Sequence, residues 1–581
     1  MTPEKISPGL LLALQDYDAA VEQGDRLGLF LQKRTLGIVA AEDSPKPPRS
    51  VVFIYCDENA NLDHLAEIGV RVNQRQGSVR TAIAPINCIG NLSDDPAVHR
   101  IKPSRYLHTS MDRAVERVKL PQYKLNNNNL TGKNVVVGVV DTGIDPKHPA
   151  FQGRVLRIWD QTLPGRGVKE GGYGVELQDP ILTTSIDENG HGTHVAGIAA
   201  GQDSLYGGVA PEADLVIVKT DLQDAHIADG IRYIFRVAGE LGRPAVVNLS
   251  LGGHADAHDG SDSLSQIIDA ESGPGRIVCC AAGNEGNDNI HAQATVSGGR
   301  THTMRFHIPS DRVGIAWLNG WYSGNCEFEV SVRTPLGFVT PFQKIIPTGN
   351  PVKEYKLPDA TIQVVTPDRD PANGDYNFFV QIRGGMFKPS LKGGTWQLRL
   401  RNLSERSGRV DVWTLDPSAS VLFTGNSVAD SVKIGSPGAS ASAITVASYT
   451  TKTKWMDIDG TPREVGLEFD TISEFSSEGP LRNQAQKPDI AAPGAMIVAA
   501  LSSDSAPERA NRVNSRFVVL AGTSMATPFV SGVVALLLQS DPTLEPEVIK
   551  ERLREVCAIP GKPPLCFDPK WGYGLIDLEK L

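Results

Sequence analysis

The chain has 581 residues, a length that predicts several domains rather than one. Apolar residues make up 40% and charged residues 21% of it, as in soluble globular proteins, and the net charge of −10 argues against a nucleic-acid partner. No stretch reaches the roughly 18 apolar residues of a membrane span, and the first residues carry no secretion signal. We therefore expect a cytoplasmic protein without a membrane partner, and export by a non-classical route stays open.

The seven cysteines indicate reduced thiols rather than a disulfide framework. Their number is odd, and Cys279 and Cys280 are adjacent within an apolar segment. The chain has no Cys-x-x-Cys pair, which argues against a structural zinc site. We expect neither a bound metal nor an organic cofactor.

The first quarter of the chain predicts an accessory region. Residues 1–48 are expected to form a helical extension, with a helix from Ser7 to Val21, and a proline-rich linker at 44–48. Residues 49–108 follow the order β-α-β-β-α-β, which predicts a small split βαβ domain without an active-site constellation. The expected strands are 51–55, 70–72, 79–83 and 100–106, and the expected helices are 62–68 and 94–98.

The central chain alternates apolar strands with helices. A nearly continuous apolar run at 134–140 predicts a strand buried on both faces of a parallel sheet. Later segments repeat the alternation, which predicts a doubly wound α/β fold. The further strands are expected at 214–219, 245–250 and 276–280, and the helices at 225–239 and 263–270.

Two polar side chains adjoin these elements. Asp141 follows the first buried strand, where α/β sheets place ligands and catalytic groups, although Asp-Thr-Gly is also ordinary turn chemistry. His191 is flanked by glycines and opens an apolar helix, so it is either structural or a general base. A zinc site shared with His194 is disfavoured, because no carboxylate follows at the required spacing.

Ser524 lies between an extended segment and the apolar run 529–538. The start of such a helix offers unpartnered N–H groups and the positive end of the helix dipole. Gly522 allows a tight approach there, and Pro528 is tolerated if it lies in the first turn. Ser524 is therefore either a helix cap or a nucleophile beside an anion-stabilising amide.

Residues 296–420 differ from their surroundings. They form short β-rich stretches separated by turn residues, and the alternation is clear at Phe328, Val330 and Val332. This pattern predicts an inserted β-sandwich domain. The expected strands are 301–308, 327–332, 376–382, 395–400 and 409–414.

Six short motifs together resemble the subtilisin-like serine peptidases, in the order that this family shows and over most of 130–295 and 421–580. They are Asp141-Thr142-Gly143, His191-Gly192-Thr193-His194, Ala281-Ala282-Gly283-Asn284, Phe475-Ser476-Ser477-Glu478-Gly479-Pro480, Lys487-Pro488-Asp489-Ile490-Ala491-Ala492-Pro493-Gly494 and Gly522-Thr523-Ser524-Met525-Ala526. The resemblance implies a catalytic domain built from 109–295 and 421–581.

The resemblance also implies roles for particular residues. His191 would take the proton of Ser524, and Asp141 would orient the imidazole. The Asn284 amide and the Ser524 N–H would form the oxyanion hole. An extended peptide would bind at Ser250, Leu251, Gly252, Gly253, Ala282 and Gly283.

We therefore expect a serine endopeptidase that cleaves protein or peptide substrates through an acyl-enzyme. The alternatives are a catalytically silent binding or regulatory protein on the same scaffold, and an esterase. An esterase would carry a Gly-x-Ser-x-Gly elbow and the chain order Ser, acid, His, and Ser524 fits neither.

Two further features concern the branch of the family and its maturation. A jelly-roll insertion at 296–420, with Arg157-Ile158-Trp159-Asp160-Gln161, resembles the Csp-like branch of clostridial germination peptidases.

The 49–108 domain is similar in layout to the family's propeptide. That likeness implies a zymogen whose own N-terminal domain is an intramolecular inhibitor, cut off near Tyr106 to Ser110.

Many of these peptidases bind calcium through an acid that follows the catalytic aspartate and a loop after the histidine helix. Here the corresponding position is Ala150, and the loop at 201–211 is short. Calcium requires about six to eight oxygen ligands, so we expect no calcium at that place.

Overall fold

The computed structural model describes residues 1–6, 14, 17, 38–39, 48–73, 76–103, 111–310, 314–385, 390–415 and 420–581. These residues divide into two compact units, Met1–His108 and Thr109–Leu581, and each has its own hydrophobic core. The helix expected from Ser7 to Val21 falls outside the described residues except at Leu14 and Tyr17, as do most of the 44–48 linker and the proposed cleavage region at 106–110.

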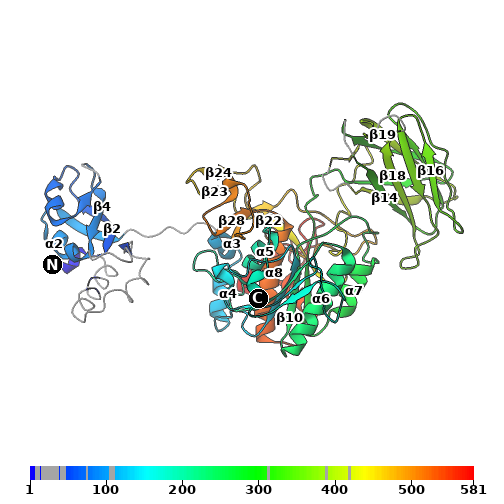
Figure 1. Ribbon diagram of the computed structural model, residues 1–581. Helices are drawn as coiled ribbons and strands as arrows, with labels where there is room; N and C mark the ends of the chain where they lie inside the picture. Colours follow the sequence, from blue (N-terminus) through cyan, green and yellow to red (C-terminus); the bar gives the residue numbers. More distant parts are fainter. Residues whose placement is uncertain are drawn as a thin grey trace. The chain divides into compact units, whose positions relative to one another are not determined.

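The first unit is built on an antiparallel sheet (Figure 1, blue). Its strands are β1 (Ile38–Val39), β2 (Arg49–Cys56), β3 (Arg71–Val72), β4 (Val79–Pro85) and β5 (Val98–Pro103). The order is β1-β2-β4-β3, and β5 pairs with β2 on the edge opposite β4, next to β1, which pairs only with Arg49 and Ser50. Three short helical segments connect them: η3 (Asp63–Ile68), η4 (Ile86–Cys88) and α2 (Ile89–Asp94).

The helical segments of this unit differ from the sequence expectation in two respects. The first, at 63–68, is a 3₁₀ helix. The second precedes 94–98 rather than occupying it, because Asp95 is extended and is followed by Pro96. A residue before proline is disfavoured in the helical conformation, so α2 ends at Asp94.

The second unit contains an eleven-stranded sheet with a parallel centre (Figure 1). The strand order is β29-β30-β26-β22-β11-β10-β6-β9-β7-β8, and β25 pairs with β22. The parallel centre comprises β7 (Val155–Asp160), β9 (Asp214–Lys219), β6 (Val136–Asp141), β10 (Ala245–Leu249), β11 (Arg276–Ala281), β22 (Ile444–Thr450), β26 (Ile490–Pro493) and β30 (Leu575–Ile576). The antiparallel edges are β8 (Val175–Leu177), β25 (Thr471–Ile472) and β29 (Cys557–Ala558).

Helices cover both faces of this sheet, as expected for a doubly wound fold. Along β6, Val137 and Val139 share one core with α5 (His191–Ala200) and α8 (Thr523–Ser540). The alternate residues Val136 and Val140 share the opposite core with α6 (Asp224–Glu240) and α7 (Ser263–Glu271). Alternate side chains of a strand point to opposite faces, so β6 is buried on both sides. The remaining helices are α3 (Met111–Arg117), α4 (Leu120–Asn126) and α9 (Pro546–Glu555).

Helix α8 is the central helix of the unit. By length and composition it is apolar enough to cross a membrane, but 83% of that span is buried inside the protein, as in a core helix. It follows the hairpin of β27 (Ile497–Ala500) and β28 (Phe517–Leu520), which agrees with the expected extended segment before Ser524. Pro528 lies inside α8 rather than in its first turn, which corrects the sequence expectation.

Between β11 and β22 the chain forms two antiparallel sheets that enclose a separate core (Figure 1, green). One has the order β12-β20-β14-β18-β17-β16 and the other β15-β19-β13-β21. Their strands are β12 (His291–Val296), β13 (Thr301–Ile308), β14 (Ala316–Tyr322), β15 (Phe328–Arg333), β16 (Val352–Lys356), β17 (Ala360–Val365), β18 (Tyr376–Gly384), β19 (Gly394–Asn402), β20 (Gly408–Thr414) and β21 (Leu422–Thr424). We call this region the β insertion; its strands extend beyond 296–420 at both ends.

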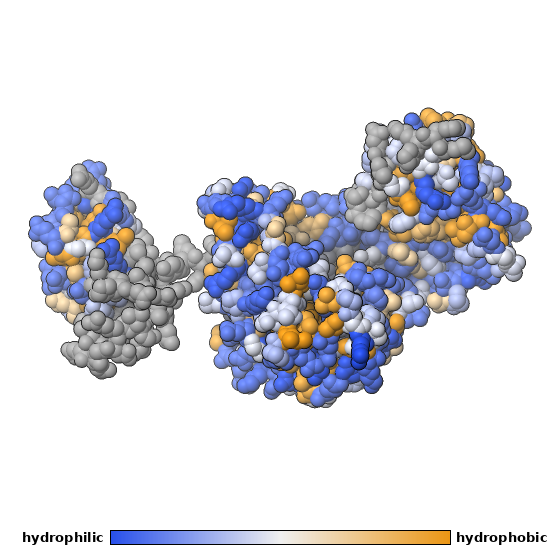
Figure 2. Space-filling model, viewed as in Figure 1, coloured by the Kyte–Doolittle hydropathy of each residue, from blue (hydrophilic) through white to orange (hydrophobic). Residues whose placement is uncertain are grey.

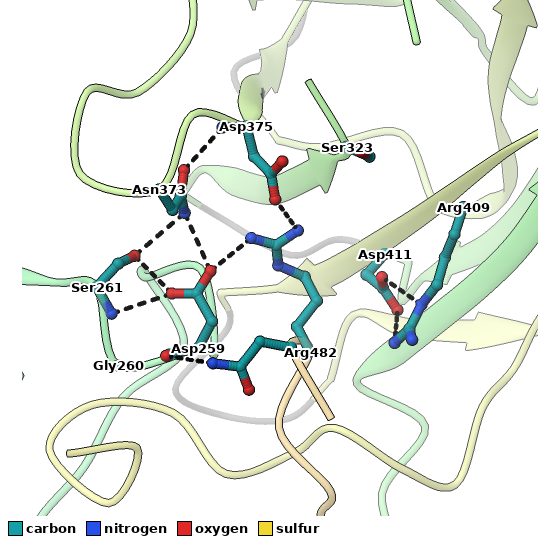
Figure 3. A pocket seen from close by; sticks show the side chains of 10 residues that line it. Asp259, Gly260, Ser261, Ser323, Asn373, Asp375, Arg409, Asp411 and Arg482 are labelled. Atoms are coloured by element: carbon teal, nitrogen blue, oxygen red, sulfur yellow. Dashed lines mark hydrogen bonds and ion pairs between the residues drawn. The ribbon is translucent and has the colours of Figure 1, made fainter. Parts of the chain in front are cut away.

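A polar cavity of about 470 Å³, which we call the junction cavity, lies where the β insertion meets the loop 250–262 (Figure 3). Arg482 donates to Asp259 of that loop and to Asp375 of the insertion, each at 2.6 Å. Arg409 pairs with Asp411 in the same cavity. On the face shown in Figure 2, hydrophilic residues predominate and apolar ones are interspersed, as the composition indicates.

Candidate active site

The fold brings Asp141 and His191 within hydrogen-bond distance. Asp141 is the buried last residue of β6, and His191 is the first residue of α5. The His191 Nδ1 atom lies 2.8 Å from Asp141 Oδ1. When Nδ1 carries the proton that Asp141 accepts, Nε2 remains as the basic nitrogen.

A buried acid that the sequence analysis did not select, Asp187, holds the loop before α5. Its carboxylate accepts hydrogen bonds from the N–H groups of Gly190 and Thr193 and from the Thr142 hydroxyl. These bonds fix the start of the helix that carries His191. An acid shortly before a helix start is a recognisable capping signal, so the sequence could have indicated this role.

The start of α5 requires glycine at position 192. A Cβ on Gly192 would lie 2.2 Å from the Gly143 carbonyl oxygen and 3.2 Å from the Asp141 Cβ. Only a residue without a side chain lets the helix begin so close to the Asp141 loop. The close approach of this helix to the Asp141 loop therefore explains why glycine follows His191.

The two histidines of this motif have different environments. Burial lowers the pKa of His191, but the adjacent Asp141 carboxylate outweighs it and holds the pKa above the ordinary value. Burial lowers the pKa of His194 to about 3, and its Nε2 lies 3.2 Å from the carbonyl oxygens of Ile497 and Val518. His194 is therefore a neutral structural histidine and shares no ligand position with His191.

Ser524 is the second residue of α8 and is half-buried. Its Oγ donates to the Ser250 carbonyl oxygen at 3.2 Å, and within the described chain no hydrogen bond joins it to His191. Catalytic hydrogen bonds are often absent without substrate, so this geometry does not exclude a nucleophile.

Pro528 contributes to the position of Ser524. Proline has no N–H, so the Ser524 carbonyl, four residues earlier, lacks its helical donor. The Ser250 hydroxyl donates to that carbonyl instead, at 2.8 Å. This bond fixes the Ser250 segment against the first turn of α8.

The side chain of Asn284 is oriented by Thr523. Its Oδ1 accepts from the Thr523 N–H at 2.8 Å and from the Thr523 hydroxyl at 3.1 Å. The two bonds identify Oδ1 as the acceptor, so the Nδ2 amide hydrogens remain available for another oxygen. An amide donor beside a serine at a helix start is suited to stabilising an oxyanion.

Glu285 is a second residue that the sequence analysis did not select. Its Oε2 accepts from the Asn284 N–H at 2.8 Å and the Ser477 hydroxyl at 2.9 Å, and His254 Nε2 lies 3.5 Å away. Burial raises the pKa of Glu285, but its contacts with His254 and Ser477 outweigh this and lower the pKa to about 2. The ionised carboxylate thus holds the backbone of Asn284 in place.

The remaining predicted residues line one cavity of about 580 Å³, which we call the substrate cavity. It is bordered by Ser250, Leu251, Gly252, Gly253, Ala282, Gly283, Asn284 and Ser524. The Gly253 N–H already donates to the Ser436 carbonyl oxygen at 3.0 Å. Within the described chain, the N–H groups of Leu251 and Gly252 have no such partner, so these two can meet an extended peptide.

The position expected to lack a calcium ligand is occupied by protein contacts. Ala150 is buried, and its carbonyl oxygen accepts from the Gln202 N–H at 2.9 Å and from the Arg154 guanidinium. The Asp203 carboxylate accepts from the N–H groups of Leu205 and Tyr206. In the part of the chain that the structure describes, no cluster of three or more His, Cys, Asp or Glu residues could hold a metal ion.

Comparison with known proteins places this chain in a family. The sequence model of the subtilase family, peptidase S8, matches residues 132–304 and 392–558. The serine protease AprX of Bacillus subtilis is 25% identical over 471 residues, which cover 80% of this chain and 70% of AprX. Subtilisin E of the same species is 30% identical over 239 residues, and the match covers 39% of this chain and 55% of that protein.

A solved structure supports the same relationship. The CspB protease of Clostridium perfringens superposes with a TM-score of 0.67 and 25% sequence identity, covering 80% of this chain and 97% of CspB. Because the family model matches more than half of the residues and the fold agrees, this chain belongs to the subtilase family of subtilisin-like serine peptidases.

Proposed function

We propose that this protein is a serine endopeptidase that uses Ser524 as nucleophile, His191 as general base and Asp141 to orient the imidazole. The observation that carries the proposal is the 2.8 Å contact of Asp141 with His191 Nδ1, which leaves Nε2 as the acceptor. Ser524 and the oriented amide of Asn284 border one cavity, which supports their roles as nucleophile and oxyanion donor.

The reaction follows from this arrangement. Ser524 Oγ leaves the Ser250 carbonyl, gives its proton to His191 Nε2 and attacks the substrate carbonyl carbon. The Asn284 amide and the Ser524 N–H stabilise the oxyanion. The C–N bond then breaks as His191 returns the proton to the leaving amine, and a water molecule hydrolyses the acyl-enzyme by the same two steps in reverse. The substrate would lie as an added strand along Leu251 and Gly252.

Labelling with a fluorophosphonate tests this proposal, because only an activated serine reacts. Wild type should lose peptidase activity as one label attaches at Ser524, and Ser524→Ala should remain unlabelled. Ser272→Ala is a matched control, since the Ser272 hydroxyl has no hydrogen-bond partner in the described structure and lies outside the substrate cavity. A folded wild type that neither takes the label nor cleaves peptides would favour a catalytically silent protein.

We also propose that the first unit is a propeptide-like domain that the enzyme cleaves off near 106–110 and retains as an inhibitor, and that the β insertion is a jelly roll. The sheet order β5-β2-β4-β3 is that of a split βαβ domain, and the division between units falls after His108. Mass spectrometry should find a new N-terminus between residues 104 and 116 in wild type and not in Ser524→Ala. An intact and fully active wild type would contradict the cleavage.

A further inference from the structure

The substrate cavity extends beyond the reacting groups to residues supplied by the β insertion. Besides Ser524 and Asn284, it is lined by Glu285, Asp288 and Lys433 and by Thr414 and Leu415 from the end of β20. If the proposed function holds, this cavity adjoins the acyl carbon and receives the side chain that precedes the cleaved bond. Its charged and polar groups then decide which side chain binds.

Two of the charged groups in the cavity are already paired. Glu285 faces His254 and accepts from Ser477 and the Asn284 backbone. Lys433 is fully buried; its Nζ donates to the Gly286 carbonyl oxygen at 2.9 Å and to Asp430 at 2.6 Å. Neither group needs a ligand to balance its charge.

Two acceptors in the cavity are not paired. The Asp288 carboxylate has no hydrogen bond or ion pair within the described chain, whereas its own N–H is bonded to the Glu285 carbonyl. The Thr414 Oγ1 atom is buried, with the residue 2% exposed, and also has no hydrogen-bond partner there. The two differ in access: Thr414 Oγ1 has almost no exposed surface, whereas Asp288 is half-buried and its carboxylate can meet a ligand in the cavity.

We propose that the substrate cavity selects a long basic side chain, arginine or lysine, in the substrate residue that precedes the cleaved bond. Asp288 is the specificity residue, because it lines the cavity with an unpaired carboxylate that can pair with the cationic head. Ile290 and Leu415 line the cavity too and can contact the aliphatic stem, which long basic side chains bury readily.

Other side chains fit these groups less well. A carboxylate would face Asp288 and would find Lys433 already bonded to Asp430. A large apolar side chain would displace water from the Asp288 carboxylate and leave it without a donor. A cationic side chain supplies both the charge and the donors that the Asp288 carboxylate lacks.

The test is a series of peptides that differ only in the residue before the cleaved bond: Arg, Lys, Gln, Leu and Glu. We expect kcat/KM for Arg and Lys to exceed that for Gln by about 10- to 100-fold. Asp288→Asn should remove most of this ratio, and Asp288→Lys should favour Glu. Glu468→Gln is the matched control, because Glu468 is exposed and lies outside the cavity.

A binding measurement separates this inference from the proposed function. The Ser524→Ala variant keeps the cavity but cannot cleave substrate. Benzamidine, a cationic probe, should bind to this variant. Adding Asp288→Asn should remove most of the affinity for benzamidine. Binding with no cleavage by wild type would overturn the proposed function alone. Cleavage with equal or higher rates for Leu or Glu, or no effect of Asp288→Asn, would overturn the basic preference.

Discussion

The substrate cavity and the junction cavity border the same loop, residues 250–262, yet their charges are arranged differently. In the junction cavity, Arg482 is bonded to two carboxylates and Arg409 lies against Asp411 (Figure 3). In the substrate cavity, the half-buried Asp288 carboxylate has no hydrogen bond or ion pair within the described chain. Paired buried charges join parts of a fold, whereas unpaired groups in a cavity are free to recognise a ligand.

This difference between the two cavities predicts that substitutions of the proposed triad abolish turnover without unfolding the protein. Ser524→Ala, His191→Ala and Asp141→Asn should each lower kcat by several orders of magnitude, because the three groups act as a unit. The double variant Ser524→Ala/His191→Ala should be little worse than either single one. Steady-state kinetics with circular dichroism checks this, and a Ser524→Ala variant that kept most of its activity would refute the assignment.

Removal of the oxyanion donor should have the next largest effect. Asn284→Ala deletes the amide that Thr523 orients, and loss of one such donor lowers kcat by about 10²- to 10³-fold. KM should change much less, because the amide acts mainly on charge that develops in the transition state. A rise in KM by the same factor, with kcat unchanged, would instead show that Asn284 binds the substrate in the ground state.

The sequence predicted the parts of the site that depend on local pattern. Local pattern placed Asp141 at the end of a buried strand and His191 and Ser524 at helix starts, where the structure has them, whereas their catalytic roles came from the family resemblance and stay a prediction. Asp187 carried a capping signal, but Asp288 did not: its lack of a partner depends on how distant segments pack. Thr414 is a similar case, because it reaches the substrate cavity from a strand of the β insertion.

One strand of the β insertion shows why its prediction was incomplete. The sequence analysis selected no strand at β14, whose residues are buried almost throughout instead of alternating. Leu318 packs in the core of the insertion, while Trp321 packs with Ala257 and Val432 outside it. A strand with apolar contacts on both faces loses the period of two that identifies a half-buried strand.

Changes in the junction cavity should have the opposite effect to the triad variants: they should lower the stability of the fold and leave turnover unchanged. Arg482→Met removes one partner from two carboxylates that are largely buried, a change that costs about 3–5 kcal/mol of unfolding free energy. The melting temperature should fall, while turnover per folded molecule should stay near that of wild type. Arg509→Ala is the control, because the Arg509–Asp459 pair is exposed and screened by water, so its loss should hardly change the melting temperature. Equal effects of the two variants would mean that the junction pairs do not stabilise the fold.

The Asp141–His191 contact predicts a shift in pH dependence. The Asp141 carboxylate keeps the pKa of His191 above its ordinary value, so the basic form appears only at higher pH. The rate of fluorophosphonate labelling should therefore rise with pH through a midpoint above about 6.5. In Asp141→Asn burial remains without the carboxylate, so the residual labelling should have a lower midpoint. A midpoint below the ordinary value in wild type would contradict the assigned contact.

The smallest expected effect concerns calcium. The Ala150 carbonyl oxygen already accepts hydrogen bonds from Gln202 and from the cationic Arg154. The Asp203 carboxylate accepts hydrogen bonds from two N–H groups of its own loop. A calcium ion there would have to displace these donors and would be repelled by the guanidinium. EDTA should therefore leave the melting temperature unchanged within experimental error, and adding calcium should not raise it. A metal present at about 100 times its Kd would add close to 2.7 kcal/mol, which melting curves resolve easily. A large decrease with EDTA that calcium reverses would contradict this prediction and show that the protein depends on a bound metal.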